Sequence, residues 1–299
     1  MEWISTCVAH VFPLLNLPIF LSSFLLFSSI VLSFYYFYCY VQRKYRKSST
    51  AFLFKHSNNE YECRELAFST ANYIHAILSS AGSIYVFYHD YFGNEMFKNE
   101  IFKDSREFNF FFSYTDNISF LMSFTLGYLC VDLICYVFVV VLHNSNTLNA
   151  VFHLVIVMAF SLFFVNGSGG VPALFGEFSE LASVTIGQEE LIEYLVPNFK
   201  HYLAYVCHNI VNSINFVITR GMMSLYLSYE LYKNYDNLLD SFTFVYENNF
   251  TAFTVVTCQV GLLILVIGIN YVFTFDCLQF SMIAYENYRI QQVKIEKQD

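Results

Sequence analysis

Long apolar runs dominate the sequence and limit what the chain can fold into. The first lies at about residues 16–41 and the last at about residues 250–284. A helical run of roughly 20 apolar residues matches the hydrocarbon thickness of a bilayer. Backbone polar groups in lipid must be satisfied internally, which a helix achieves within one segment. The runs therefore predict an all-α membrane protein built as a bundle of transmembrane helices.

Composition agrees with that prediction and narrows the partners. Only 13% of the residues are charged, whereas a soluble domain carries roughly 25%. The formal net charge of −9 comes with no basic stripe, so we expect membrane lipids and no nucleic acid as partners. The eight cysteines form no CxxC pair, and no apolar run carries an HxxxH or ExxH spacing. We therefore expect no metal site, no disulfide framework and no cofactor.

We expect about seven spans. They lie at about residues 16–41, 66–88, 118–142, 149–165, 171–186, 201–232 and 250–284. A glycine-rich break at 166–170 precedes the fifth segment, which is near the lower length limit and is either a span or re-entrant. An acidic stretch at 188–200 is expected at the inner surface. The predicted parts are an N-terminal span with a basic loop (1–65), a six-helix membrane domain (66–284) and a polar tail (285–299).

The cations orient the predicted spans. Ten fall in inner segments, four in outer segments and one, Arg220, within a span, which accounts for all fifteen: Arg43, Lys44, Arg46, Lys47, Lys55, Arg64, Lys200, Arg289, Lys294 and Lys297 inside, and Lys98, Lys103, Arg106 and Lys233 outside. Cytoplasmic loops carry the excess of Lys and Arg. The N-terminus is thus predicted on the outer or lumenal side and the C-terminus on the cytosolic or matrix side.

Polar side chains inside the apolar runs are the candidate functional residues. Ionisable groups at membrane depth are costly and usually face a bundle interior. The sixth run carries a polar stripe with a spacing typical of one helical face. The candidates are His75, Asp132, His153, Glu177, His208, Asn212, Asn215 and Arg220. These residues either bind a lipid headgroup or form hydrogen bonds between helices.

Two local environments can be anticipated. Arg220 requires a counter-charge, for which Asp132, Glu177 and Asp276 are candidates. Asp132 has Tyr128 and Tyr136 four residues away on either side, so a phenol can satisfy its carboxylate without any ligand.

Several short motifs, in order along residues 69–276, resemble those of the TLC-domain (TRAM–Lag–CLN) family of membrane proteins, which includes the ceramide synthases. They are Ser69 with His75-Ala76, Gly127-Tyr128-x-x-x-Asp132, Glu177-Phe178-Ser179, Asn215 to Arg220, and Asn270. The resemblance implies a TLC-like helical bundle in the endoplasmic reticulum. It also implies acyl transfer from acyl-CoA to a sphingoid base, with histidine as general base.

One departure from the family pattern bears on activity. The family's acyltransferases carry a His-His pair at the start of the fourth span, where this chain has Phe152-His153. Loss of a general base typically lowers the rate by about 10²- to 10⁴-fold. The first hypothesis is therefore a non-catalytic structural subunit of a larger membrane assembly, with other integral membrane subunits as partners and a lipid possible in its polar interior. Such a subunit would sit in the endoplasmic reticulum or the mitochondrial inner membrane.

Two alternatives remain open. One is an acyl-CoA-dependent N-acyltransferase with His153 as base and Asp132 supporting it, acyl-CoA being a co-substrate only in this case. The other is a lipid-sensing or lipid-transfer protein.

Overall fold

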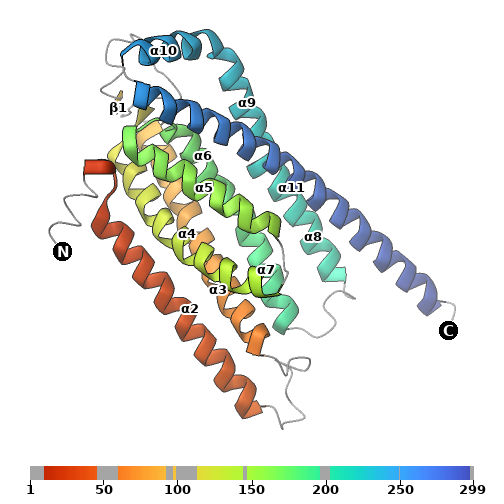
Figure 1. The fold of residues 1–299 in the computed structure, drawn as a ribbon. Coiled ribbons are helices and arrows are strands. Elements are labelled where there is room, and N and C mark those ends of the chain that lie inside the picture. The colour runs from red at the N-terminus through yellow and green to blue at the C-terminus, as the bar shows by residue number, and fades with distance from the viewer. Residues whose placement is uncertain are drawn as a thin grey trace. The chain divides into compact units, whose positions relative to one another are not determined.

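The computed structural model describes residues 10–45, 60–91, 97–98, 113–143, 147–195, 203–248 and 250–296, and these are almost entirely helical (Figure 1). The elements are α2 (Leu17–Tyr45), α3 (Glu60–Val86), η1 (Phe87–Tyr91), β1 (Phe97–Lys98), β2 (Ser113–Tyr114), α4 (Asp116–His143), α5 (Thr147–Asn166), α6 (Gly170–Ser179), α7 (Leu181–Leu195), α8 (Leu203–Phe216), η4 (Val217–Met222), α9 (Met223–Lys233), α10 (Tyr235–Asn248) and α11 (Phe250–Glu296). The segments η1 and η4 are π-helical. The strands β1 and β2 form one short antiparallel pair.

Three of the described helices are long and apolar enough to cross a membrane. The qualifying stretches are Leu17–Lys44 in α2, Asp116–Cys135 in α4 and Phe250–Ile290 in α11. A shorter apolar stretch, Val151–Asn166, lies in α5. The fold is thus all-α with three candidate membrane-spanning helices, which agrees with the predicted all-α membrane protein, while the count of seven spans stays a prediction.

The chain divides into two compact units. Unit 1 holds residues 1–27, 78–179 and 223–269, and unit 2 holds residues 28–77, 180–222 and 270–299. The helices α2, α3 and α11 contribute residues to both units. Each unit is described by itself.

In unit 1, α4 lies beside α5 and α6. The start of α2 packs closely on α4 because the facing α4 side chains are small. Ser119, Ser123 and Gly127 follow at four-residue intervals, the small-residue spacing that lets helices approach closely in membranes. A Cβ at Gly127 would lie 2.5 Å from the carbonyl oxygen of Phe20.

The break between α5 and α6 falls at the predicted glycine-rich segment. Gly167 and Gly169 have φ values of 76° and 77°, a region that favours glycine. The backbone N–H and the hydroxyl of Ser168 both donate to Asn166 Oδ1. On the α11 side, Gln259 Nε2 donates to the Ser168 carbonyl (2.7 Å), and the Ser168 hydroxyl donates to Gln259 Oε1. The break is therefore a defined turn.

In unit 2, α7 lies against α8 and η4. The π-helical turn η4 contains Thr219, Arg220 and Gly221, all buried. A π-turn places one extra residue in a helix and often marks a functional position. Here it sets the direction of Arg220 within what the sequence predicts as one uninterrupted span.

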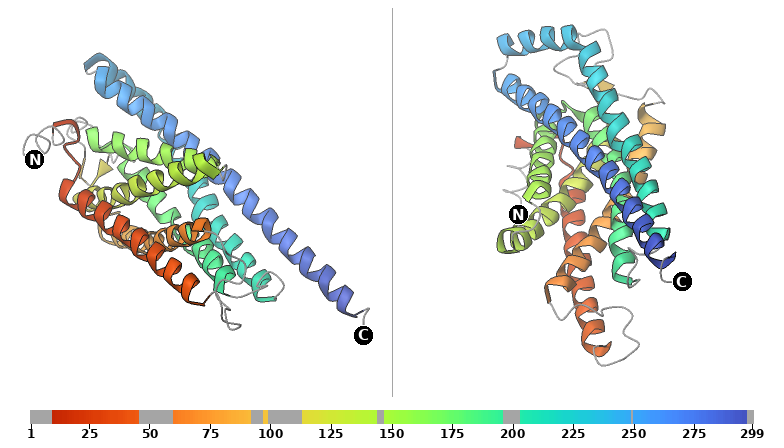
Figure 2. Two further views of the ribbon diagram at one scale, coloured as in Figure 1. Left: turned by 60° about the horizontal axis from the view of Figure 1, so that its bottom comes forward. Right: turned by 90° about the vertical axis from the view of Figure 1, so that its right-hand side faces the viewer.

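Three segments differ from the sequence expectation. The predicted fifth segment, 171–186, is two helices, α6 and α7, separated at Glu180, and α7 continues into the stretch expected at the inner surface. The Ser179 hydroxyl donates to the Gly176 carbonyl, a local bond that competes with helix continuation. The last helix, α11, continues to Glu296 as one helix (Figure 2). No Gly or Pro follows residue 268 to end it earlier.

The third difference is α10, which was not predicted. It turns sharply from α9 (Figure 2) after Asn234, whose side-chain amide donates to the carbonyl and the carboxylate of Glu230.

Candidate functional site

Asp132 is the most deeply placed acid of unit 1. Its side chain is 0% exposed, and that of His153 on α5 is 18% exposed. The Tyr128 hydroxyl donates to Asp132 Oδ1 at 2.8 Å, and Nδ1 of His153 donates to Oδ2. Both carboxylate oxygens are therefore engaged, and Nε2 is the ring nitrogen of His153 that points away from the pair. The predicted contact of a phenol with Asp132 is confirmed for Tyr128, while the side chain of Tyr136 lies outside the described residues.

Phe152, which stands where the resemblance to the TLC family would expect a histidine, is buried beside this pair. Its ring centroid lies 6.0 Å from that of His153. The site therefore has one imidazole and one phenyl ring where a His-His pair would supply two imidazoles.

Glu177 forms a second polar centre in unit 1, on α6. It is 1% exposed. The Thr125 hydroxyl of α4 donates to Glu177 Oε2 at 2.9 Å, and the Ser79 hydroxyl of α3 donates to the same oxygen. Thr125, Tyr128 and Asp132 follow at i, i+3 and i+7, so one face of α4 carries the contacts of both carboxylates.

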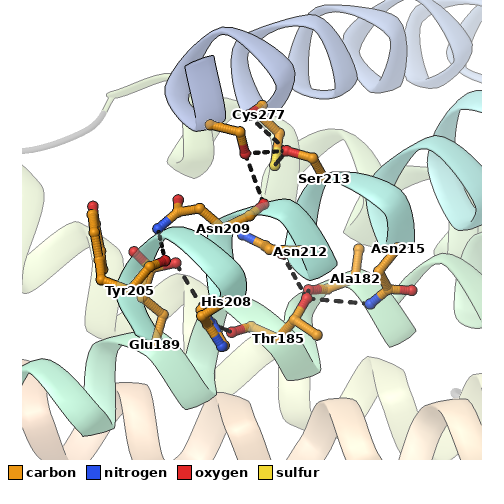
Figure 3. A network of polar contacts seen from close by, with 11 residues as sticks. Ala182, Thr185, Glu189, Tyr205, His208, Asn209, Asn212, Ser213, Asn215 and Cys277 are labelled. Carbon is orange, nitrogen blue, oxygen red and sulfur yellow. Dashed lines mark hydrogen bonds and ion pairs between the residues drawn. The ribbon is translucent and has the colours of Figure 1, made fainter. Parts of the chain in front are cut away.

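The polar stripe predicted on the sixth span lies against α7 in unit 2 (Figure 3). Thr185 of α7 forms hydrogen bonds with three residues of the stripe, Asn212, Asn215 and His208. Its hydroxyl donates to Asn212 Oδ1 at 2.6 Å and accepts from Asn215 Nδ2 at 3.2 Å. Its carbonyl accepts from His208 Nε2 at 3.1 Å. The stripe therefore pairs two helices.

Two further polar contacts join the same pair of helices. Asn215 Nδ2 also donates to the Leu181 carbonyl at 2.8 Å. Nε2 of His208 lies 3.7 Å from Glu189 Oε2. Both partners belong to α7, the helix that also carries Thr185.

A second polar face of α8, not predicted from the sequence, lies against α11 within unit 2 (Figure 3). The Ser213 and Ser281 hydroxyls are 2.5 Å apart, and Ser281 donates to the Asn209 carbonyl at 2.7 Å. Ser213 also donates to the carbonyl of Cys277 at 3.0 Å. The i, i+4 spacing of Asn209 and Ser213 was the available signal, but it does not say which helix is opposite.

Arg220 is buried in unit 2 with 5% of its surface exposed, and the acid that interacts with its charge is Glu180, which the sequence analysis did not single out. Arg220 donates to the Ser183 hydroxyl at 3.2 Å and to Asn270 Oδ1 at 3.5 Å. Its guanidinium carbon lies 5.2 Å from the ring centroid of Phe216 and 5.6 Å from that of Phe273. Cation–π contacts stabilise a desolvated cation.

Asp276 and His75 are the two remaining residues that the sequence analysis singled out. Asp276, a candidate counter-charge for Arg220, is exposed on α11. His75 is buried on α3 in unit 2. Among the described residues, no group of three or more His, Cys, Asp or Glu side chains is placed to hold a metal ion.

Sequence reasoning also missed a buried acid where α3 meets α4. Asp90 in η1 is 1% exposed. It accepts from the Asn117 amide at 2.9 Å and from the Thr115 hydroxyl. Thr115 in turn caps α4 by accepting from the Ile118 N–H at 3.1 Å. Asp90 therefore fixes the start of α4. This role could not be read from the sequence, where Asp90 is only a charged residue at the edge of an apolar run.

The predicted residues thus gather in distinct sets. In unit 1, Asp132 pairs with His153, and Glu177 binds hydroxyls of α3 and α4. In unit 2, Asn212, Asn215 and His208 meet at Thr185.

Comparison with protein-family models, with curated proteins and with solved structures found no match to this chain.

Proposed function

We propose that this chain is a non-catalytic integral membrane protein that serves as a structural subunit of a larger membrane assembly. The observation that carries the proposal is that Glu177 and the polar stripe of α8 are held by side chains of other helices. Glu177 accepts from two hydroxyls, and Thr185 links two asparagines of the adjacent helix. Contacts of this kind hold helices together in lipid without any chemical turnover.

The proposal includes the TLC-like bundle of seven spans, with the N-terminus on the outer side. Three long apolar helices and the basic end of α2 support it. In this proposal the polar interior holds a lipid, and the assembly lies in the endoplasmic reticulum or the mitochondrial inner membrane.

Co-purification tests the proposal. The tagged full-length chain is extracted in a mild detergent, and its partners and lipids are identified by mass spectrometry. We expect other integral membrane proteins in near-stoichiometric amounts. A chain that purifies from its native membrane alone, as a monodisperse monomer, would contradict the subunit role.

The Asp132–His153 pair favours a second candidate, an acyl-CoA-dependent N-acyltransferase. Asp132 orients the imidazole through Nδ1, and Nε2 would accept a proton from an attacking amine. The amine nitrogen would form a bond to the thioester carbonyl carbon, the C–S bond would break, and the proton would pass to the departing thiolate.

Activity separates the two candidates. Purified protein is incubated with long-chain acyl-CoA and a sphingoid base, and amide product is measured. Turnover that disappears in His153→Ala would support the acyltransferase. The subunit proposal predicts no amide above background for either protein.

A further inference from the structure

The end of α2 carries an outward face of aromatic and basic side chains. Tyr36 and Tyr40 are 67% and 59% exposed, and Lys44 follows four residues later. The Lys44 ammonium lies 5.5 Å from the centroid of the Tyr40 ring. Arg43, beside it, is exposed as well.

Contacts within unit 2 establish which face of α2 is turned outward. The hydroxyls of Tyr38 and Thr70 are 3.0 Å apart, and the Cys63 thiol donates to Gln42 Oε1 at 3.4 Å. Tyr38 and Gln42 therefore face α3. Two residues along a helix correspond to about 200° of rotation, so Tyr36, Tyr40 and Lys44 lie on the opposite face.

Charge and position together identify the occupant of this face. The residues of α2, Leu17–Tyr45, include no Asp or Glu, and Arg43 and Lys44 lie in the last turn, although the whole chain has a net charge of −9. Exposed tyrosines at the end of an apolar helix are typical of the headgroup level of a bilayer. Lys and Arg beyond them reach toward lipid phosphates.

We propose that this face, formed by Tyr36, Tyr40, Arg43 and Lys44, is a binding site for anionic phospholipids. The tyrosine rings lie beside the part of the acyl chain next to the headgroup, and the two cations bind the negatively charged headgroup. This inference rests on the proposed membrane-spanning role of α2. It adds to that role the class of lipid selected at one end of the helix.

Lipid quenching of a local fluorophore tests the proposal. The native tryptophan, Trp3, is removed by Trp3→Phe, and Tyr40→Trp places a reporter indole within the face while keeping an exposed aromatic ring. The full chain is reconstituted in phosphatidylcholine vesicles containing either brominated phosphatidylglycerol or brominated phosphatidylcholine. Relative quenching gives the preference for the anionic lipid.

We expect at least a fivefold preference at low salt, since a cation near an anionic surface contributes about fivefold in affinity. Arg43→Gln combined with Lys44→Gln should abolish it, and added salt should weaken it. The matched control is Arg289→Gln, which removes an exposed cation of α11 and should leave the preference unchanged.

The remaining outcomes overturn the proposal in distinguishable ways. Equal quenching by both lipids, or a preference that survives loss of both cations, would refute anionic selectivity and leave the membrane span intact. Absence of quenching by either lipid would show that this end of α2 is not at the membrane, which refutes the span as well.

Discussion

Thr185→Val removes one hydroxyl from the α7–α8 interface while keeping the shape of the side chain. The hydroxyl donates to Asn212 Oδ1 at 2.6 Å and accepts from Asn215 Nδ2 at 3.2 Å. A buried polar group that loses its partner costs about 1–3 kcal/mol, whereas interhelical hydrogen bonds in membranes average about 0.6 kcal/mol. We therefore expect a loss of about 1–2 kcal/mol, which lowers the midpoint of thermal unfolding by about 2–4 °C in a chain of this size.

The two asparagines should respond unequally. Asn215 keeps a bond of 2.8 Å to the Leu181 carbonyl, whereas Thr185 is the described donor to Asn212 Oδ1. In double-mutant cycles, Thr185→Val should therefore couple more strongly to Asn212→Leu, by about 1 kcal/mol, than to Asn215→Leu.

The assay follows the monodisperse peak in size-exclusion chromatography after heating in detergent. Thr257→Val is the matched control, because Thr257 is exposed on α11 and its hydroxyl donates to the Phe253 carbonyl of its own helix. A Thr185→Val variant as stable as this control, or coupling that is larger for Asn215 than for Asn212, would refute the reasoning.

Three further predictions concern unit 1. Gly127→Ala should destabilise the protein by about 1–3 kcal/mol and so lower the unfolding midpoint, because the added Cβ would meet the backbone of α2. The control is Gly261→Ala, which has open space around the added Cβ and should leave the midpoint unchanged or raise it. Gln259→Leu removes two hydrogen bonds to Ser168 and should lower the same midpoint by several degrees, with Thr257→Val again as control; an unchanged midpoint would count against the turn. Phe152→His should create no acyl-CoA-dependent amide formation, because adding an imidazole beside His153 supplies no acyl-CoA site; amide product in a mass-spectrometric assay would argue for an enzyme.

The parts of the fold that follow from hydropathy and helical periodicity could be predicted. The break at 166–170 lies between α5 and α6, where two glycines adopt positive φ. The polar stripe of the sixth span does face another helix, because Asn212 and Asn215 cannot be left cheaply in lipid.

Features that depend on the opposing helix could not be predicted. Periodicity locates the stripe on α8 but does not identify Thr185 as its partner. The division at Glu180 and the π-turn that directs Arg220 arise from local hydrogen bonds and packing, which an apolar run does not encode. The amphipathic helix α10 is too short and too polar to stand out by hydropathy.

A density map of the full chain in a lipid nanodisc tests the central claim most directly, because that claim concerns where the buried polar side chains point. The account predicts the Asp132 carboxylate against Tyr128 and His153, and the Glu177 carboxylate against Ser79 and Thr125. A map in which these two carboxylates face the acyl chains, away from those partners, would contradict it.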